Sequence, residues 1–344
     1  MEAQAGFRKS MGTIDNVFVV HGLITHMLNE NKKLYVGFID FSKAFDYVVR
    51  DILWFKLIRY GVRGKILNVI KSMYSNVKSR VLLNGTLSES IFCSLGVRQG
   101  ECLSPFLFSM YVNDLEETFC VNGFKGVDIG MLKLFLLIYA DDIAIFADSK
   151  ESLQIGLDLL KSYCDRWKLK VNVNKTKVMI FHRGGNPYPN TMFMYGENEV
   201  EIVRKFTYLG IVFSPGGSFI ETTKALSGQA LKAIYKLQSY LYKFTDISVA
   251  HRLELFDKLI LPILNYGSEI WGYNRSNVVE RIHLAFCKNA LGVRKSTQNN
   301  LVYGELGRTP LIYKRYVSII RYWLKIIHCE NTKYIKLMYK VMHK

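Results

Sequence analysis

The sequence is poor in the features that mark secreted, disordered or membrane-spanning proteins. Its six cysteines are scattered without a CxxC pair, which favours reduced thiols in an intracellular protein over a disulfide framework or a zinc site. Six prolines in 344 residues and 49% hydrophobic content argue against a disordered chain. No signal-peptide pattern opens the sequence. The most apolar stretch, Leu132 to Ala147, contains Asp141 and Asp142 and is too short and too charged to span a bilayer.

Acidic residues are also few, and the formal net charge is +17 with a pI near 9.5. An excess of this size indicates a polyanionic partner, with nucleic acid first and an anionic membrane second. A basic surface without any partner is the plain alternative. The charge is uneven, because residues 218–344 hold 20 Lys and Arg against eight Asp and Glu. The C-terminal part is therefore the expected polyanion-binding region.

The clearest linker is the segment Ser214-Pro215-Gly216-Gly217, and we place a domain boundary there. Before it, apolar runs and amphipathic repeats alternate, whereas after it the pattern is helical and basic. The predicted strands are 35–39, 134–138, 143–146, 177–181 and 201–213, with a hairpin turn at Asn84-Gly85. The predicted helices are 51–60, 64–74, 152–168 and 222–243, and a further one opens at Ser104-Pro105.

Three aspartates follow apolar runs in a way that suggests a metal site. Asp40 ends the strand 35–39, and Asp141-Asp142 lie at the tip of a tight strand-turn-strand. Two like charges at one tip are costly without a cation. Nucleotidyl transfer commonly uses two Mg²⁺ ions roughly 3.5–4 Å apart, and these hard cations prefer carboxylate oxygens. We therefore predict that Asp40, Asp141 and Asp142 converge on metal, while a solvated Asp-Asp turn is the alternative.

Five segments resemble, in the same order, motifs of reverse transcriptases from LINE-type (non-LTR) retrotransposons. They are FIDFSKAFD (38–46), GVRQGECLSP (96–105), YADD (139–142), NVNKTK (172–177) and YLG (208–210). YADD alone is a moderate signal, whereas five ordered motifs are a strong one. The resemblance spans roughly Gln4 to Phe213. Segments 261–271 and 304–310 are similar to regions beyond the polymerase core of such elements.

The resemblance implies an α+β right-hand polymerase with an antiparallel palm sheet and a helical thumb. Partial fingers would occupy residues 1–34, the palm with the remaining fingers elements 35–213, and a basic helical thumb with a C-terminal extension 214–344. Part of the family's fingers and its upstream endonuclease domain have no counterpart in this sequence. We therefore expect an N-terminally truncated form of the family's protein.

The resemblance also implies catalytic roles. Asp40 and Asp141 would bridge two Mg²⁺ ions, or Mn²⁺ in their place, with Asp142 more peripheral and the carbonyl of Phe41 as a further ligand. Lys175 would act as general acid toward pyrophosphate or as a cation near it, although Lys177 is two residues away and the sequence does not separate the two.

Other motif residues would handle the nucleotide and the primer. Phe45 occupies the family's steric-gate position, where a bulky ring excludes a ribose 2′-OH. Gln99 and Gly100 would contact the nucleotide, with glycine allowing close backbone approach. Asp46 also matches the motif, but an aspartate before a helix is more often a cap or a surface charge. The primer grip would be formed by Tyr208, Leu209 and Gly210.

The expected reaction is addition of dNTPs to a DNA primer 3′-OH on an RNA template, in the nucleus or cytoplasm and without a membrane. The oligomeric state is left open. One alternative is an inactive nucleic-acid-binding remnant of such a polymerase. Others are an RNA-dependent RNA polymerase of the same palm class and a basic α/β protein with no nucleic-acid partner.

Overall fold

The computed structural model describes residues 2–184, 191–243, 247–274 and 276–343. Two compact units are present, one from residues 1–16 and 27–204 and the other from 17–26 and 205–344. The linker-based boundary at Ser214 lies within the second unit. Because compact units need not coincide with polymerase domains, the assignment of fingers, palm and thumb stays a prediction. Within the described residues, no helix is long and apolar enough to cross a membrane.

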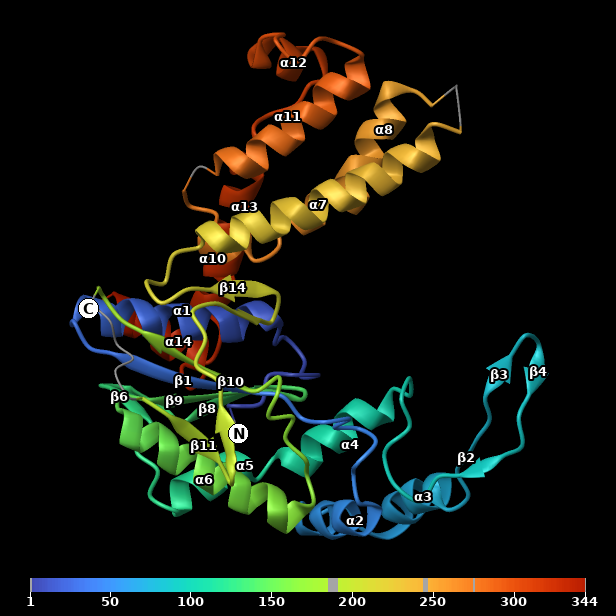
Figure 1. Ribbon diagram of the computed structural model, residues 1–344, viewed down its shortest axis with the longest axis vertical. Coiled ribbons are helices and arrows are strands. Elements are labelled where there is room, and N and C mark those ends of the chain that lie inside the picture. Colours follow the sequence, from blue (N-terminus) through green and yellow to red (C-terminus); the bar gives the residue numbers. More distant parts are fainter. Residues whose placement is uncertain (1, 185–190, 244–246, 275, 344) are drawn as a thin grey trace. The chain divides into compact units, whose positions relative to one another are not determined.

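The first unit is built on an antiparallel sheet with the strand order β10-β1-β9-β8 (Figure 1). Its strands are β1 (Leu34–Ile39), β8 (Leu136–Tyr139), β9 (Asp142–Ala147) and β10 (Lys177–Phe181). The central strands read as nearly continuous apolar runs because β1 and β9 are buried along most of their length. The four corresponding predicted strands are therefore confirmed, as is the antiparallel sheet.

The helix α6 packs on β1 and β9 of this sheet and α5 packs on α6, while further helices and short hairpins complete the unit. The helices are α2 (Arg50–Arg59), α3 (Gly64–Tyr74), α4 (Leu103–Val112), α5 (Leu115–Val121) and α6 (Lys150–Trp167). The hairpin strands are β2 (Lys78–Ser79), β3 (Leu82–Leu83), β4 (Thr86–Leu87), β5 (Ile91–Phe92), β6 (Val127–Ile129), β7 (Leu132–Leu134), β11 (Phe193–Tyr195) and β12 (Asn198–Val200). The turn at Asn84-Gly85 is confirmed, since both residues have positive φ between β3 and β4.

The helix α6 shows how the sequence produces this layer. Ser149 caps its N-terminus, its hydroxyl accepting a hydrogen bond from the Ser152 backbone N–H at 3.2 Å. Leu153, Leu157 and Leu160 recur at helical spacing and are fully buried. Figure 1 shows α6 running along the sheet on the same face as α5.

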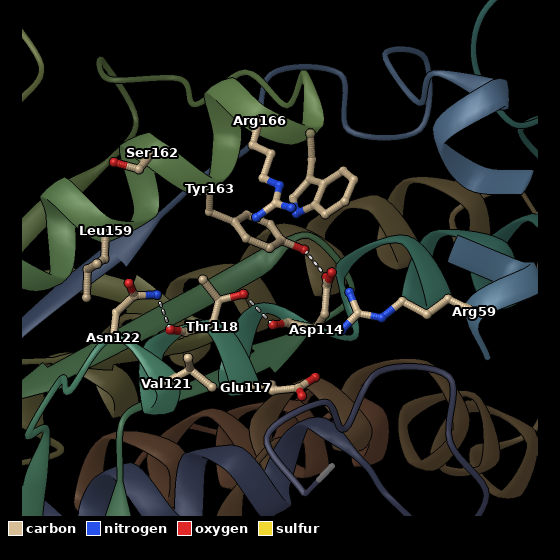
Figure 2. Close-up of a pocket in the computed structure, with 11 residues that line it drawn as sticks. Arg59, Asp114, Glu117, Thr118, Val121, Asn122, Leu159, Ser162, Tyr163 and Arg166 are labelled. Atoms are coloured by element: carbon tan, nitrogen blue, oxygen red, sulfur yellow. Dashed lines mark hydrogen bonds between the residues drawn. The ribbon is translucent and has the colours of Figure 1, made fainter. Parts of the chain in front are cut away.

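A buried charged cluster joins α2, α5 and α6. Lys56 is 1% exposed, and its ammonium donates hydrogen bonds to Asp114 Oδ1 at 2.7 Å and Tyr163 Oη at 3.1 Å. The same ammonium lies 4.0 Å from the centre of the Trp167 ring. Figure 2 shows the Tyr163 hydroxyl directed at the Asp114 carboxylate, to which it also donates. Because every member has a partner, the cluster can fasten three helices together.

The second unit consists of a β-hairpin and a set of helices. The hairpin pairs β13 (Phe206–Tyr208) with β14 (Ile211–Phe213). The helices are α1 (Thr13–Asn29, of which residues 17–26 belong here), α7 (Ile220–Leu241), α8 (Val249–Leu255), the π-helix η1 (Phe256–Ile260), α9 (Leu261–Leu264), α10 (Ser268–Trp271), α11 (Asn277–Leu291), α12 (Asn299–Glu305), α13 (Leu311–His328) and α14 (Tyr334–Met342). Strand was predicted over 201–213, and the structure places two strands in this range, because the chain reverses at Leu209-Gly210, which both have positive φ.

A polar network holds the helices of the second unit together. The carboxylate of Glu280 on α11 accepts hydrogen bonds from the hydroxyl of Tyr303 and from the Leu311 backbone N–H. Arg308 donates to Asp257 Oδ2 at 2.7 Å and contacts the ring of buried His283 at 3.1 Å. The segment 304–310, noted in the sequence, therefore has a structural role at the meeting of these helices.

Candidate active site

The register of the sheet brings Asp40 beside the aspartate pair. Ile39 of β1 lies opposite Ile143 of β9, so Asp40, the next residue, faces the position of Asp142. Facing residues on antiparallel strands have Cα atoms roughly 4.5–5.5 Å apart. Tyr139 and Asp142 close the hairpin of β8 and β9 and leave Ala140 and Asp141 as its turn. The structure therefore gathers Asp40, Asp141 and Asp142 at one end of the sheet, and their convergence on metal stays a prediction.

The electrostatics of the three aspartates reflect their proximity. The pKa of Asp142 is raised to about 6, first by desolvation and then by the negative charges of Asp141 and Asp40, while Lys175 lowers it. A divalent cation among these oxygens would offset the same repulsion. The donor set therefore fits a hard metal ion in its chemistry. As the side chains stand, however, no group of three or more His, Cys, Asp or Glu residues in the described part of the chain could hold a metal.

The segment 170–177 wraps around Asp40. The Asn172 backbone N–H donates to the carbonyl of Asp40 at 2.8 Å, and the Asp40 backbone N–H donates to the Thr176 hydroxyl at 3.2 Å. Thr176 is fully buried, so its hydroxyl is a fixed acceptor. Reasoning from the sequence assigned no role to Thr176, and its place between two lysines of a motif was the only signal. In the structure its hydroxyl holds the backbone at the end of β1, where Asp40 lies.

The structure separates the two lysines that the sequence left equivalent. The Lys175 ammonium lies 3.8 Å from Asp40 Oδ2, and its side chain is 70% exposed. The Lys177 ammonium instead pairs with Glu201 at 2.7 Å. Lys175 is therefore the lysine that faces the carboxylates.

A tight backbone contact supports the aspartate turn. Ala140 has φ +59°, a left-handed conformation that is strained for alanine. The Ala5 backbone N–H donates to the Ile138 carbonyl at 2.9 Å, which extends β8 with the N-terminal segment. Gly6 follows, and a Cβ there would lie 2.3 Å from the Ala140 nitrogen. Only glycine fits at position 6, a constraint that the sequence alone did not show.

The predicted nucleotide-binding residues lie on two adjoining segments of the first unit. The Phe45 ring stacks on Phe108 of α4 with 5.0 Å between centroids. Phe41 is buried, and it forms an isolated antiparallel bridge with Val171. Gln99 donates from Nε2 to Asp46 Oδ1 at 2.9 Å. Gly100 has φ +88° with open space where a Cβ would point. Their roles toward a nucleotide remain predictions.

Two hollows lie in the first unit, and they differ in content. A groove of about 1030 Å³ is lined by Asp46, Arg50, Lys78, Arg98 and Gln99, among others. It adjoins the segments that carry the predicted nucleotide-binding residues, and it is rich in cations. The hollow of about 450 Å³ in Figure 2 lies over α5 and α6 and contains no predicted site residue. Of these two hollows, the groove is the one that adjoins predicted site residues.

The predicted primer grip lies in the second unit, at the turn between β13 and β14. Tyr266 donates from its hydroxyl to the Leu209 carbonyl at 2.8 Å. A Cβ on Gly210 would lie 2.7 Å from the Tyr266 ring, so the turn is packed against that residue. Tyr208 is buried. The turn is thus rigidly held, and its role as a primer grip stays a prediction.

Comparisons with known proteins bear on this site. Residues 1–213 match the profile of the family described as "Reverse transcriptase (RNA-dependent DNA polymerase)". The chain is 29% identical over 293 residues to a probable RNA-directed DNA polymerase from transposon BS of Drosophila melanogaster, covering 80% of this chain and 31% of that protein. It is 26% identical over 325 residues to a Pol polyprotein from the type-1 retrotransposable element R2 of Popillia japonica, covering 90% of this chain and 44% of that protein.

The chain spans about a third of the first two relatives that it matches. Among solved structures, telomerase from Candida tropicalis gives a TM-score of 0.43 with 14% identity, covering 98% of this chain and 57% of that one. A likeness of this size does not define a fold. The profile match, which covers more than half of the chain, does define the family.

Proposed function

This chain belongs to the reverse transcriptase family, and we propose that it is an RNA-directed DNA polymerase that adds dNTPs to a primer 3′-OH. The observation that carries the proposal is the register placing Asp40 beside the Asp141–Asp142 turn. The right-hand polymerase fold of the family, the antiparallel sheet and the retrotransposon relatives support it. An RNA template and a DNA primer are the partners, and the nucleus or cytoplasm is the location.

We propose Mg²⁺ as the cofactor, in two sites, with Asp40 and Asp141 as shared ligands and Asp142 more peripheral. The bound ions would lower the pKa of the primer hydroxyl and neutralise charge on the phosphates. The chain's own residues orient the reaction. The Asn172 N–H and the Thr176 hydroxyl fix the backbone of Asp40. Lys175 delivers a proton, or a positive charge, to the leaving pyrophosphate.

Primer extension tests the proposal directly. Purified chain is incubated with poly(rA)/oligo(dT), dTTP and Mg²⁺, and the product length is measured with and without EDTA. We expect extension that EDTA abolishes. Salt-sensitive binding of the duplex without any extension would instead identify a nucleic-acid-binding remnant. Extension with UTP in preference to dTTP would favour an RNA polymerase.

Phe45→Ala should relax the choice of sugar. Phe108 fixes the Phe45 ring from one side, so the ring can act as a rigid barrier to a 2′-OH. Removing it should raise rNTP incorporation relative to dNTP by about tenfold or more, since steric discrimination of one small group is worth about 1–3 kcal/mol. Single-nucleotide incorporation kinetics with dTTP and UTP measure the ratio. A Phe106→Ala variant, which removes an exposed ring of α4, is the control. An unchanged ratio would reject the gate.

Lys175→Ala should slow extension far more than Lys177→Ala. Lys175 faces Asp40, whereas Lys177 is engaged by Glu201. Loss of a general acid typically lowers a rate by about 10²–10⁴-fold. Rapid-quench measurement of single-nucleotide addition gives both values. If the larger loss falls on Lys177→Ala, the assignment made from these distances is wrong.

A further inference from the structure

Two segments of the first unit are joined by backbone hydrogen bonds, and both contribute residues to the lining of the groove. The Val97 backbone N–H donates to the Phe45 carbonyl, and the Gly96 N–H donates to the Val48 carbonyl, both at 2.8 Å. A Cβ on Gly96 would lie 2.9 Å from the Asp46 carbonyl oxygen, and its φ is +83°. The absence of a side chain at Gly96 therefore lets the two backbones touch. We call these segments, residues 45–48 and 96–99, the seam.

One contact between side chains crosses the seam. Gln99 Nε2 donates to Asp46 Oδ1 at 2.9 Å, and both residues are exposed. Asp46 does not cap the following helix, because the N-cap of α2 is Val49 and has no side-chain cap bond. Of the two readings that the sequence left open for Asp46, the helix cap is wrong, whereas the surface charge agrees with its exposure. Its carboxylate is directed instead at the amide of a predicted nucleotide-binding residue.

Side chains of α2 and α4 hold the seam in place. Arg50 donates hydrogen bonds to the carbonyls of Gly96 at 3.0 Å and Leu95 at 3.1 Å. Phe45 rests on Phe108. Asp46 and Gln99 both line the groove of about 1030 Å³. Their contact therefore lies on the surface of the groove, on a backbone that is already fixed.

We propose that Asp46 is a positioning residue for substrate selection: its carboxylate sets the orientation of the Gln99 amide beside Phe45, and so determines how the site holds the sugar of the incoming nucleotide. The inference rests on the proposed polymerase function. A carboxylate only accepts hydrogen bonds, so Asp46 favours the orientation of the Gln99 amide in which Nε2 faces the carboxylate. In that orientation Oε1 is left available to the substrate. Asparagine at 46 offers both an acceptor and a donor, and therefore loses that selection while preserving shape.

The contact itself is tested by NMR on the full chain. The side-chain ¹⁵N–¹H₂ pair of Gln99 is identified as the signal missing in Gln99→Glu. In Asp46→Asn this signal should move by more than its linewidth, and in Asp51→Asn it should not. Asp51 is an exposed carboxylate of α2 and provides a matched loss of charge. A Gln99 signal indifferent to Asp46→Asn would overturn the contact.

The consequence is tested by nucleotide incorporation. Asp46→Asn should raise KM for dTTP by about tenfold, the usual value of one hydrogen bond to a charged group, and lower the dTTP-to-UTP preference. The value of kcat should change less than about threefold, because Asp46 acts through Gln99 and not on the reacting atoms. In a Gln99→Ala background, Asp46→Asn should have no further effect. Additive effects of the two substitutions would overturn the positioning role.

The two proposals fail separately. If wild-type chain extends no primer, the polymerase function is refuted, and equilibrium affinity for dTTP is measured instead. An affinity that drops about tenfold in Asp46→Asn but not in Asp51→Asn would still support Asp46 as a positioning residue. Absence of dTTP binding by the wild type, or equal affinities of all three proteins, would refute it.

Discussion

Asp141→Asn should abolish primer extension while leaving the fold and duplex binding in place. The substitution removes one of two proposed shared ligands, and a bound divalent ion contributes several kcal/mol to stabilising the transition state. We expect a loss of about 10³-fold or more in the rate of nucleotide addition, equivalent to on the order of 4 kcal/mol. Asp142→Asn, at the more peripheral ligand, should lose less. Rapid-quench kinetics at saturating Mg²⁺ and dTTP measure both.

Measurements of the free energy of unfolding and of duplex affinity distinguish a loss of catalysis from a loss of structure in Asp141→Asn. The negative charge of Asp141 raises the pKa of Asp142, so the three carboxylates repel one another in the absence of metal. Removing one charge should leave the unfolding free energy unchanged or slightly increased, and duplex affinity no weaker. Asp128→Asn, an exposed strand carboxylate on β6, controls for charge and should retain full activity. If Asp141→Asn keeps more than about a tenth of the wild-type rate, Asp141 is no metal ligand in a two-metal site.

The sequence was most informative where a local pattern had only one reading. The apolar run ending at Asp40 and the two runs flanking Asp141 became β1, β8 and β9, and the two-residue turn at Ala140-Asp141 fixes the register of β8 against β9. These local patterns predicted the strands, while the resemblance of the ordered motifs was needed to favour a shared carboxylate site over a solvated turn. The order of motifs predicted the family, which the profile match over residues 1–213 bears out.

The parts that the sequence did not predict depend on contacts between distant segments. Gly6 supports the turn at Ala140 from more than a hundred residues away, and nothing local marks that contact. The position of Asp46 before α2 suggested a helix cap or a surface charge, and only the seam with 96–99 shows its partner. Lys175 and Lys177 could not be told apart until Glu201 was placed beside one of them. The periodicity of apolar residues predicts local helices and strands, but it does not predict which distant segments pack together.

The largest effect on stability is expected at Asp114, which the sequence did not single out at all. Asp114→Ala leaves the ammonium of Lys56 buried, with two hydrogen-bond acceptors in place of three and no counter-charge. Removing one partner of a buried ion pair typically costs about 3–5 kcal/mol. Glu117→Ala is the control, because Glu117 is an exposed carboxylate of α5, the helix that Asp114 directly precedes, and lines the same hollow (Figure 2). It should change stability by less than about 0.5 kcal/mol.

The loss at Asp114 should depend on pH in a defined direction. Burial lowers the pKa of Lys56 to about 8 from its ordinary 10.5, and Asp114 opposes that shift. Between these values the unfolded chain binds more protons, so the contribution of Lys56 to stability rises with pH from about 8 to 10.5. Without Asp114 the pKa of Lys56 in the folded chain falls further, so the rise in stability with pH begins at a lower pH. The deficit of Asp114→Ala should therefore shrink as pH rises toward about 8 and stay constant above it.

Urea unfolding followed by tryptophan fluorescence measures these differences, since Trp167 lies against the Lys56 ammonium. The double variant Lys56→Met/Asp114→Ala removes both charges and should be more stable than Asp114→Ala alone. This recovery separates an unpaired charge from a simple cavity, because a cavity would be deepened by the second substitution. Equal deficits for Asp114→Ala and Glu117→Ala, or a deficit that grows with pH, would show that Lys56 is not held as a buried cation by Asp114.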